Sequence, residues 1–581
     1  MTVANPKTLL LGFVNTHNSY LTSKTMPLGL KVISSAAKRA GWQVEGKYWG
    51  TEITVDRFVE DLLRIRPEIL GLYTDMMNIF TIARLLNRVK PELRPFTILG
   101  GPEVTFNYAQ IANLIPAEIL VRGPGERIIM DLLNGDVHNA SFLQQISGIS
   151  YRMNGTTYHN PDRRPESIPS LLPDVKLIPE SSNTYFLYTA HGCPNSCAFC
   201  SENAVPYLPR KTEDIRKELS LACRDERPGW ILIVDDTFTA DVRRCRKLLD
   251  ILKSEYGGPW SCELTVESIY KNPSLASELV DAGLTRLQIG IESLNDETLR
   301  LYRKRATRDQ TIMAINSLLQ AGVHCVFGNF IVGAPGETKA MIEQNIAAAQ
   351  ELIRKYPGQI ELSASILSYN PGAPFFDEPE LFGLTISEQA ILGSSDLRSA
   401  VSSTNTLSKY EIMALHEQFN DAISKEVGEV MAKIPREIIK SHMNFHDLGL
   451  STIWSKKMMA TRHISTFYRM VYFDGSHLDI EDIPADTLPD QVPQRTGIQI
   501  RLKANGNVIL QGFPGELNEL NPTASLLYEL ACGKHTIREI TVILQRKIPG
   551  AARQPTARIM DDVIAFYSQL ANKLQVVFLE Q

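Results

Sequence analysis

The sequence predicts an α/β protein built from four consecutive segments, on three observations. At 581 residues the chain is long enough for roughly three to four ordinary domains. Strand-like and helix-like runs alternate over residues 1–150 and again over 183–380, which is typical of parallel sheets covered by helices. Residues 381–490 have a mainly helical pattern, and residues 496–581 combine three short strands with helices, which indicates a small domain of its own.

The composition predicts a soluble protein without a strong attraction for polyanions. Hydrophobic residues make up 44% and charged residues 22%, and the net charge is −5. No basic field therefore favours nucleic acid or an anionic membrane surface. The apolar run Leu9–Val14 is too short to span a bilayer and lacks the cleavage site of a signal peptide. We expect a cytoplasmic protein that binds neither nucleic acid nor membrane.

The first segment predicts a parallel, doubly wound sheet. Its helical patterns include Leu28–Ala40 and Val55–Ile65. Ligands of such sheets bind beyond the carboxyl ends of the strands, where glycine-rich and polar turns occur here. Residues 136–182, rich in Pro, Ser and Asn, are expected to form a small strand pair and a linker. The expected strands are Leu9–Val14, Gln43–Trp49, Ile69–Tyr73, Phe96–Leu99 and Ile119–Val121.

The second segment repeats this alternation and is expected to form a partial barrel. Helical patterns such as Pro273–Ala282 and Asp309–Ala321 separate its strands. In the helical segment that follows, His442 and His446 stand at helical spacing, but without a third ligand nearby we interpret them as surface or packing residues. The expected strands are Leu187–Ala190, Trp230–Val234, Trp260–Val266, Leu284–Ile291, Val323–Val332 and Glu361–Ser368.

The last segment begins with a predicted β-hairpin and ends with helices. Asn505-Gly506 is the expected hairpin turn. Asn521 followed by Pro522 predicts a helix start, and Thr536 with Glu539 predicts a capping box for the next helix. The expected strands are Ile498–Leu502, Asn507–Gln511 and Glu516–Leu520.

Eight cysteines are few for this length, and three of them crowd into one stretch. Cys193, Cys197 and Cys200 follow a predicted strand while the others are scattered, which favours a metal or redox site over a disulfide framework. Three thiolates at this spacing can hold three irons of a 4Fe–4S cluster and leave the fourth iron open. The alternative is a zinc site with His191 as fourth ligand, although structural zinc sites usually pair their ligands in two C-x2–4-C halves.

The cysteine spacing resembles that of the radical S-adenosylmethionine superfamily, and the resemblance extends over residues 185–375. It implies that the open iron binds S-adenosylmethionine. An electron from the cluster, delivered by a flavodoxin- or ferredoxin-type donor, would then split this cofactor into a 5′-deoxyadenosyl radical. By the same resemblance, Phe199 lies near the adenine. Asp235 and Asp236, at the end of the next strand, are expected to contact the methionine amino group.

Later strands carry further parts of this resemblance. Glu292 and Ser293, in the run Gly-Ile-Glu-Ser, match the strand that meets the ribose. Arg303 or Lys304 is expected to meet the carboxylate of S-adenosylmethionine. Thr265 departs from the family pattern, because many relatives have an arginine there. Each of these motifs is weak alone, and their order behind the cysteines carries the prediction.

Residues 1–150 resemble the cobalamin-binding domain that precedes many radical S-adenosylmethionine enzymes. Glycines in its turns let backbone N–H groups approach a corrinoid and its nucleotide tail. The Asp-x-His-x-x-Gly signature of histidine-ligated cobalamin is absent and His17 lacks that context, so we expect no histidine from that motif on cobalt. The alternative is a domain that kept this fold and lost the ligand. The expected cobalamin-binding residues are Thr74, Asn78, Gly100, Gly101, Gly123, Gly125 and Glu126.

Residues 496–581 resemble the winged-helix-like PqqD-type domain that recognises leader peptides of ribosomal peptide natural products. The resemblance lies in the order of Glu516–Ala524, Tyr528-Glu529-Leu530 and Thr536–Ile540 rather than in any one motif. It implies that the leader of a precursor peptide docks by strand addition at a sheet edge. A DNA-binding winged fold is the alternative, which the acidic balance and the lack of a basic helix disfavour.

Together these resemblances imply a cobalamin-dependent radical enzyme that methylates an unactivated carbon of a ribosomally made peptide. In such an enzyme the deoxyadenosyl radical removes hydrogen and methylcobalamin delivers the methyl group. The runner-up is a radical peptide epimerase, or another maturase without cobalamin, in which Cys325 or Cys262 would return the hydrogen atom. A third reading is a non-catalytic sensor that binds cobalamin and an iron–sulfur cluster and needs no contacts to S-adenosylmethionine.

Overall fold

The computed structural model divides the chain into two compact units. One comprises Met1–Gln350 with Leu362–Ile423, and the other Glu351–Glu361 with Ser424–Gln581. The described residues are 7–16, 27–164, 167–177, 184–225, 228–386, 402–447, 450–460, 477–478, 480, 483–495, 500–504, 507–511, 517–548, 550–572 and 575–579. None of the helices among them is long and apolar enough to cross a membrane.

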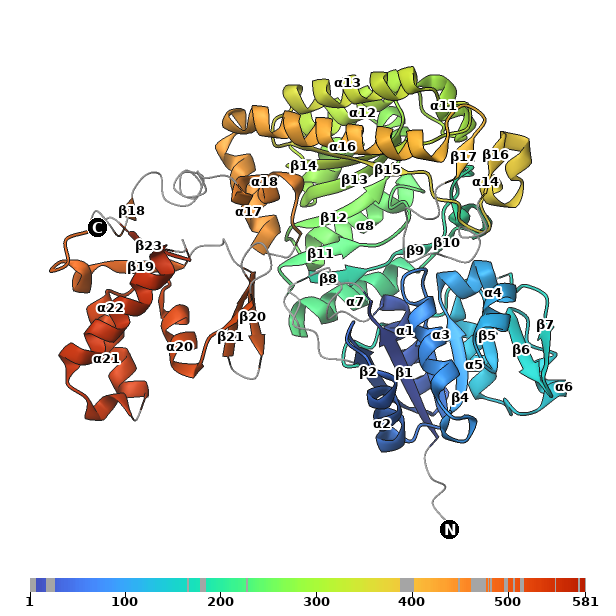
Figure 1. Ribbon diagram of the computed structural model, residues 1–581, viewed down its shortest axis with the longest axis horizontal. Coiled ribbons are helices and arrows are strands. Elements are labelled where there is room, and N and C mark those ends of the chain that lie inside the picture. Colours follow the sequence, from blue (N-terminus) through green and yellow to red (C-terminus); the bar gives the residue numbers. More distant parts are fainter. Residues whose placement is uncertain are drawn as a thin grey trace, which may run out of the picture. The chain divides into compact units, whose positions relative to one another are not determined.

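The first sheet has seven strands in the order β2-β1-β3-β4-β5-β6-β7 (Figure 1). β1 to β5 pair in parallel, as predicted, and β6 and β7 continue the sheet antiparallel. α1 and α5 pack on one face and α2 to α4 on the other, so two apolar cores enclose the sheet. The strands are β1 Thr8–Val14, β2 Gln43–Trp49, β3 Ile69–Tyr73, β4 Phe96–Gly100, β5 Ile119–Val121, β6 Ile149–Met153 and β7 Thr156–His159. The helices are α1 Leu28–Arg39, α2 Val55–Ile65, α3 Ile79–Arg88, α4 Pro102–Leu114, α5 Gly125–Leu133 and α6 Ala140–Leu143.

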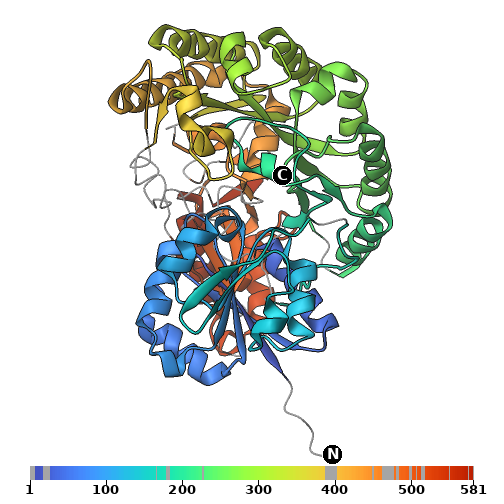
Figure 2. The same cartoon turned by 90° about the vertical axis from the view of Figure 1, so that its right-hand side faces the viewer.

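The second sheet has six strands in the order β15-β14-β13-β12-β11-β8, and Figure 2 shows it as an open arc with helices on its outside. The pairs from β8 to β14 are parallel, which confirms the predicted partial barrel. The strands are β8 Thr184–Leu187, β11 Trp230–Ile233, β12 Trp260–Leu264, β13 Leu284–Glu292, β14 Cys325–Val332 and β15 Ile360–Ile366. The helices are α7 Thr212–Asp225, α8 Val242–Glu255, α9 Val266–Lys271, α10 Leu275–Asp281, α11 Asp296–Leu301, α12 Arg308–Gln320, α13 Lys339–Lys355 and α14 Pro374–Asp377.

The predicted helical segment contains α16 Lys409–Val430, α17 Arg436–Asp447 and α18 Ile453–Ala460. Within it, His442 is fully buried, and its Nε2 lies 2.5 Å from the backbone oxygen of Gly358. Its Nδ1 lies 2.9 Å from Thr452 Oγ1. His442 is therefore a packing residue, as predicted, and the side chain of His446 lies outside the described part of the chain.

Two short strands that precede residue 496 pair with the last strand of the chain. β18 His477–Leu478 and β19 Val492–Arg495 both pair with β23 Val576–Leu579 at the far end of the chain. The predicted three strands form a separate antiparallel sheet in the order β20-β21-β22, and the predicted turn Asn505-Gly506 lies outside the described residues. Its strands are β20 Ile500–Ala504, β21 Asn507–Gln511 and β22 Leu517–Glu519, and its helices are α20 Pro522–Leu530, α21 Ile537–Lys547 and α22 Thr556–Asn572.

Both predicted helix caps of this domain are present. The side chain of Asn521 accepts a hydrogen bond from the backbone of Ala524, with Pro522 at the first helical position. Thr536 and Glu539 form the capping box at the start of α21. Each cap satisfies backbone donors that the helix itself leaves free.

Candidate functional site

The three clustered cysteines lie on a loop that follows β9, the short strand Ala190–His191. Gly192 begins this loop with a φ of +68°, and a Cβ there would collide with the backbone oxygens of Val205 and Pro206. The middle of the loop is fixed by two backbone hydrogen bonds, from Ala198 N to Tyr302 O (3.1 Å) and from Phe375 N to Ala198 O (2.9 Å). Backbone hydrogen bonds to Tyr302 and Phe375 therefore fix the position of this loop.

Cys193, Cys197 and Cys200 are free and half-buried. Asn195 Nδ2 donates to the sulfur of Cys193 at 3.4 Å, and burial raises the pKa of Cys200 to about 12. Neutral thiols become thiolate ligands when they bind a positively charged metal centre, which displaces their protons into solvent. Among the described residues, no three His, Cys, Asp or Glu side chains converge on one point to hold a single metal ion.

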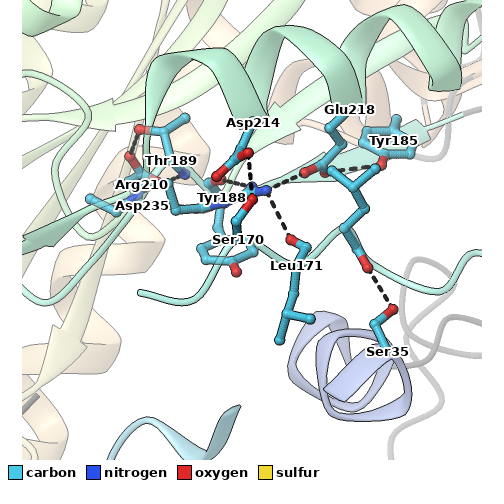
Figure 3. Close-up of polar contacts among 12 residues, drawn as sticks. Ser35, Ser170, Leu171, Tyr185, Tyr188, Thr189, Arg210, Asp214, Glu218 and Asp235 are labelled. Atoms are coloured by element: carbon cyan, nitrogen blue, oxygen red, sulfur yellow. Dashed lines mark hydrogen bonds and ion pairs between the residues drawn. The ribbon is translucent and has the colours of Figure 1, made fainter. Parts of the chain in front are cut away.

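Asp235 lies just after β11 with its carboxylate buried, and its contact to S-adenosylmethionine stays a prediction. Its carboxylate is buried and accepts hydrogen bonds from the backbone and hydroxyl of Thr189 and from the backbone of Ala190 (Figure 3). Arg244 also donates to the Thr189 hydroxyl, at 3.1 Å. Asp235 therefore stabilises the turn before the cysteines through Thr189 and Ala190. Its neighbour Asp236 is exposed and lines the cavity between this turn and the first sheet.

Glu292 and Lys304 form an ion pair of 3.0 Å beside the cysteines. A register shift between Gly290 and Glu292 and a φ of +59° at Glu292 re-aim this side chain at the end of β13. Burial alone would lower the pKa of Lys304, but the nearby Glu292 and Cys197 raise it above its ordinary value. Lys304 is therefore a positively charged side chain, paired with Glu292, next to Cys197.

Two other predicted contacts point elsewhere. Ser293 is fully buried, and its hydroxyl oxygen accepts from Asn345 Nδ2 at 3.1 Å and from Asn295 N at 3.1 Å, which orders the turn after β13. Its contact to a ribose stays a prediction. Arg303 is exposed, with its guanidinium 6.0 Å from the ring centroid of Phe382, which leaves Lys304 as the predicted carboxylate partner beside the cysteines.

Phe199 and Thr265 occupy different environments. The Phe199 ring packs edge-on against Tyr302 with 5.1 Å between centroids, in the apolar cluster that includes Ala198. This is a suitable wall for an aromatic base, and the adenine contact stays a prediction. Thr265 stands at the start of α9 without a side-chain capping bond.

A cavity of about 480 Å³ joins the first sheet to the cysteine loop. One wall comes from β1, from the carboxyl ends of β3, β4 and β5 and from α1, α4 and α5. The other comes from the turn before the cysteines, from residues after them and from residues just after β11. The first wall includes Leu11, Gly29, Gly71, Gly101, Gly123 and Gly125. The second wall includes Tyr188, His191, Gly192, Glu202, Val234 and Asp236.

The predicted cobalamin-binding residues divide into two groups. Gly100, Gly101, Gly123, Gly125 and Glu126 line the cavity. Gly101 has a φ of +122°, and a Cβ there would meet the backbone of Thr74, so only glycine lets these two turns touch.

Thr74 and Asn78 are not among the residues that line the cavity, and their contact to cobalamin stays a prediction. The hydroxyl of Thr74 donates to Gly100 O at 3.0 Å. Asn78 accepts from Asp75 N at 3.0 Å and donates to Tyr73 O at 3.2 Å. Both residues therefore order the loop after β3 and act on the cavity through the backbone they hold.

The deep end of the cavity fits the tail of a corrinoid. Side chains of Leu9, Leu11, Val32, Ile98 and Ile129 line it, and all five are buried in the first domain's core. An apolar slot of this kind suits an aromatic base, while the glycine turns above it offer backbone N–H groups to polar substituents. The residues present thus fit cobalamin.

Glu126 pairs with His191, a contact that could not be predicted from the sequence. Its Oε1 lies 2.9 Å from His191 Nε2, so the first domain contacts the strand that precedes the cysteines. Burial alone would raise the pKa of Glu126, but His191 lowers it below its ordinary value. This pairing also gives His191 a role other than the fourth zinc ligand of the alternative reading.

The turn before the cysteines rests on a buried network that sequence reasoning missed. Arg210 donates to Glu218 Oε2 at 2.6 Å and to Tyr188 O at 2.7 Å, and the Tyr185 hydroxyl donates to Glu218 Oε1 at 3.0 Å (Figure 3). Tyr185 lies on β8, Tyr188 in the turn after β8, and Glu218 on α7, and Arg210 directly follows the short strand β10 (Leu208–Pro209). The bonded residues are separated by up to 33 positions in the chain. No local motif joins them, and the only signal in the sequence was a charged pair eight residues apart.

The two cysteines proposed as hydrogen donors lie away from the cluster loop. Cys262 is in the middle of β12, fully buried, with its pKa raised well above the ordinary value by burial and by the nearby Cys245 of α8. Cys325 begins β14, at the end of the strand opposite to the carboxyl edge where ligands bind. Neither placement suits a residue that returns hydrogen to a substrate.

Two family models match the chain in the order that the fold indicates. Residues 18–133 match a B12 binding domain, and residues 187–349 match the radical SAM superfamily, where SAM is S-adenosylmethionine. The first range covers α1 to α5 and leaves out β1, β6 and β7, and the second covers β11 to β14 and the cysteine loop.

Among curated proteins, the chain is 26% identical over 342 residues to an uncharacterised methyltransferase of Pyrococcus horikoshii, covering 56% of this chain and 73% of that protein. It is 25% identical over 319 residues to an anaerobic magnesium-protoporphyrin IX monomethyl ester cyclase of Rubrivivax gelatinosus, covering 52% and 57%. Among solved structures, the radical S-adenosylmethionine methyltransferase TsrM of Kitasatospora setae has a TM-score of 0.57 at 15% identity, covering 72% of this chain and 89% of that chain. The chain therefore joins a B12-binding domain to a radical SAM domain, the pair of folds whose cofactors are cobalamin, S-adenosylmethionine and a 4Fe–4S cluster.

Proposed function

We propose that this chain is a cobalamin-dependent radical methyltransferase that acts on an unactivated carbon of a ribosomally made peptide. The observation that carries the proposal is the single cavity walled by the strand ends of the B12-binding domain and by the turn before the cysteines. A methyl donor and a radical source must both reach one carbon, and a shared cavity allows this. When bound, cobalamin supplies the methyl group, and S-adenosylmethionine with the cluster supplies the radical that removes hydrogen.

The chain's own residues hold, orient and shield these groups. The three cysteines anchor the cluster on a loop that backbone hydrogen bonds keep in place. Glu292 and Lys304, an ion pair beside Cys197, present opposite charges to the ammonium and carboxylate of S-adenosylmethionine. The Phe199–Tyr302 wall and the apolar depth of the cavity exclude water from a reactive site.

The peptide part of the proposal rests on the C-terminal domain. Its antiparallel sheet ends at β22, whose outer edge has no partner strand in the described chain. Strand addition to such an edge captures an extended peptide through main-chain hydrogen bonds. A leader docked there would raise the local concentration of its own core segment at the catalytic domain.

The methyltransferase reading is favoured over the epimerase. A relative and a structural neighbour are both named methyltransferases, and neither candidate cysteine lies at the cluster loop. We therefore advance methyl transfer as the single candidate reaction.

The first test is metal content together with cofactor cleavage. Anaerobically reconstituted protein should carry about four irons and four sulfides per chain. Changing Cys193, Cys197 and Cys200 together to Ala should abolish the brown chromophore and the formation of 5′-deoxyadenosine. Active protein with stoichiometric zinc and no iron would refute the proposal.

A further inference from the structure

A polar contact in the cavity wall joins the B12-binding domain to the turn before the cysteines. Glu126, in the first turn of α5, has a side chain only 7% exposed, and its Oε1 lies 2.9 Å from His191 Nε2. Glu126 directly follows the Gly123–Gly125 turn that lines the corrinoid side of the cavity. His191 is two residues before Cys193. The contact thus joins the turn expected to hold cobalamin to the loop expected to hold the cluster.

The His191 ring also packs against the core of the catalytic domain, through Tyr188. It stacks on Tyr188 with 5.0 Å between centroids and 28° between planes. The guanidinium of Arg210 lies 4.2 Å from the centroid of the same Tyr188 ring, and Arg210 is fixed by a buried ion pair of 2.6 Å with Glu218. Figure 3 shows Arg210 at the centre of these contacts, next to Tyr188. His191 therefore has little freedom to move independently of the catalytic domain's core.

We propose that Glu126 and His191 form a latch that fixes the distance between cobalamin and the iron–sulfur cluster. Both are positioning residues, and the proposal rests on the proposed function, because it needs both cofactors bound. A turn that shifts by about 1 Å can cost about 100-fold in rate when two reacting groups must meet. A latch between the two cofactor-holding turns prevents such a shift.

The test measures the spin–spin coupling between the reduced cluster and cob(II)alamin, both paramagnetic, in reconstituted protein without substrate. In the molecules that carry both cofactors, Glu126→Ala should broaden the distance distribution. Glu126→Gln, which keeps a hydrogen-bond acceptor, should restore most of the narrow distribution. Asp131→Asn is the matched control, because Asp131 lies on the same helix and pairs with Arg163 at 2.7 Å outside the cavity.

A second set of variants separates a latch from general damage. His191→Ala should broaden the distribution as Glu126→Ala does, and the double variant should be no worse than either single one, since one contact is removed in each case. In turnover, both single variants should raise the ratio of 5′-deoxyadenosine to methylated product by about tenfold or more.

Three results would overturn the latch. The first is an unchanged distance distribution in Glu126→Ala with both cofactors bound, and the second is equal broadening in Asp131→Asn. The third is loss of cobalamin binding in Glu126→Ala, which would make Glu126 a direct ligand contact instead. Failure of methyl transfer with the coupling contrast intact would refute only the proposed function, so the two failures are distinguishable.

Discussion

At the residue scale, adjacent side chains of one motif point in different directions and make different contacts. Asp235 is buried against Thr189 and Ala190 while Asp236 opens to the cavity, and Ser293 is buried while Glu292 turns toward Lys304. Both pairs lie where β11 and β13 end, and the positive φ of Glu292 shows that the backbone turns there, so adjacent residues take different directions. A sequence match assigns both to the ligand, and only the tertiary contacts divide them.

Glu337 allows a pH test at the same scale. Its Oε2 accepts from Gly333 N at 2.8 Å and Ala334 N at 3.1 Å, its Oε1 has no partner among the described residues, and burial raises its pKa to about 7. The folded state thus binds this proton more tightly than the unfolded chain. The stability it contributes is full below the ordinary carboxyl pKa near 4.5 and is lost as pH rises through about 7.

Glu337→Gln should remove this dependence, because an amide stays neutral. At about pH 5 the variant and wild type should unfold alike, and at about pH 8 the variant should be more stable by up to about 3 kcal/mol, from 1.4 kcal/mol per tenfold change in proton affinity. Calorimetry at the two pH values measures the difference. Equal stability of the two proteins at both values would contradict the assigned pKa.

At the element scale, the register of β22 decides which residue a docked peptide would meet. Leu520 N donates to Val508 O at 2.8 Å, and Asn518 pairs with Leu510 in the same register. Alternate residues of an antiparallel strand direct their N–H groups to the same side, so the N–H of Asn518 also faces β21, and that of Glu519 faces the open edge. Proline at Asn518 would therefore break the sheet rather than probe the edge.

Glu519→Pro should weaken binding of a leader peptide by about tenfold, because it removes one edge donor worth about 1 kcal/mol and adds a clash. Glu519→Ala is the control, since it also loses the side-chain contact to Asn507 but keeps the N–H. Isothermal titration with a leader peptide compares them. If Glu519→Pro binds as well as Glu519→Ala, the peptide does not add to this edge.

At the scale of the whole molecule, truncation separates docking from chemistry. The C-terminal fold starts with β18, which pairs with β23, so the cut belongs before His477 rather than at residue 496. Protein lacking residues 476–581 should keep its cluster and slow cleavage of S-adenosylmethionine. Modification of a full precursor peptide should fall steeply, because the local concentration of the core segment is lost. Mass spectrometry of the peptide measures this, and full activity of the truncated protein on a peptide would exclude a docking role.

Much of the architecture could be predicted from the sequence, because hydrophobic periodicity and turn residues are local signals. Both sheets, the cysteine loop, the glycine turns and the caps at Asn521 and Thr536 follow from such patterns. Contacts between distant segments were not predictable. The pair of Glu126 with His191 spans 65 residues and that of Tyr185 with Glu218 spans 33, and no periodicity links them. In the same way, the pairing of β18 with β23 has no local signal, because the two strands lie far apart in the sequence.

The most direct measurement of the central claim is the product balance of the reconstituted protein with a candidate precursor peptide. A methyl group taken from S-adenosylmethionine leaves S-adenosylhomocysteine, and reductive cleavage leaves 5′-deoxyadenosine, so a radical methyltransferase releases both. We predict that S-adenosylhomocysteine, 5′-deoxyadenosine and a peptide in which a methyl group has replaced one hydrogen form together only when cobalamin is present. Formation of 5′-deoxyadenosine without S-adenosylhomocysteine, at a rate independent of cobalamin, would contradict the account.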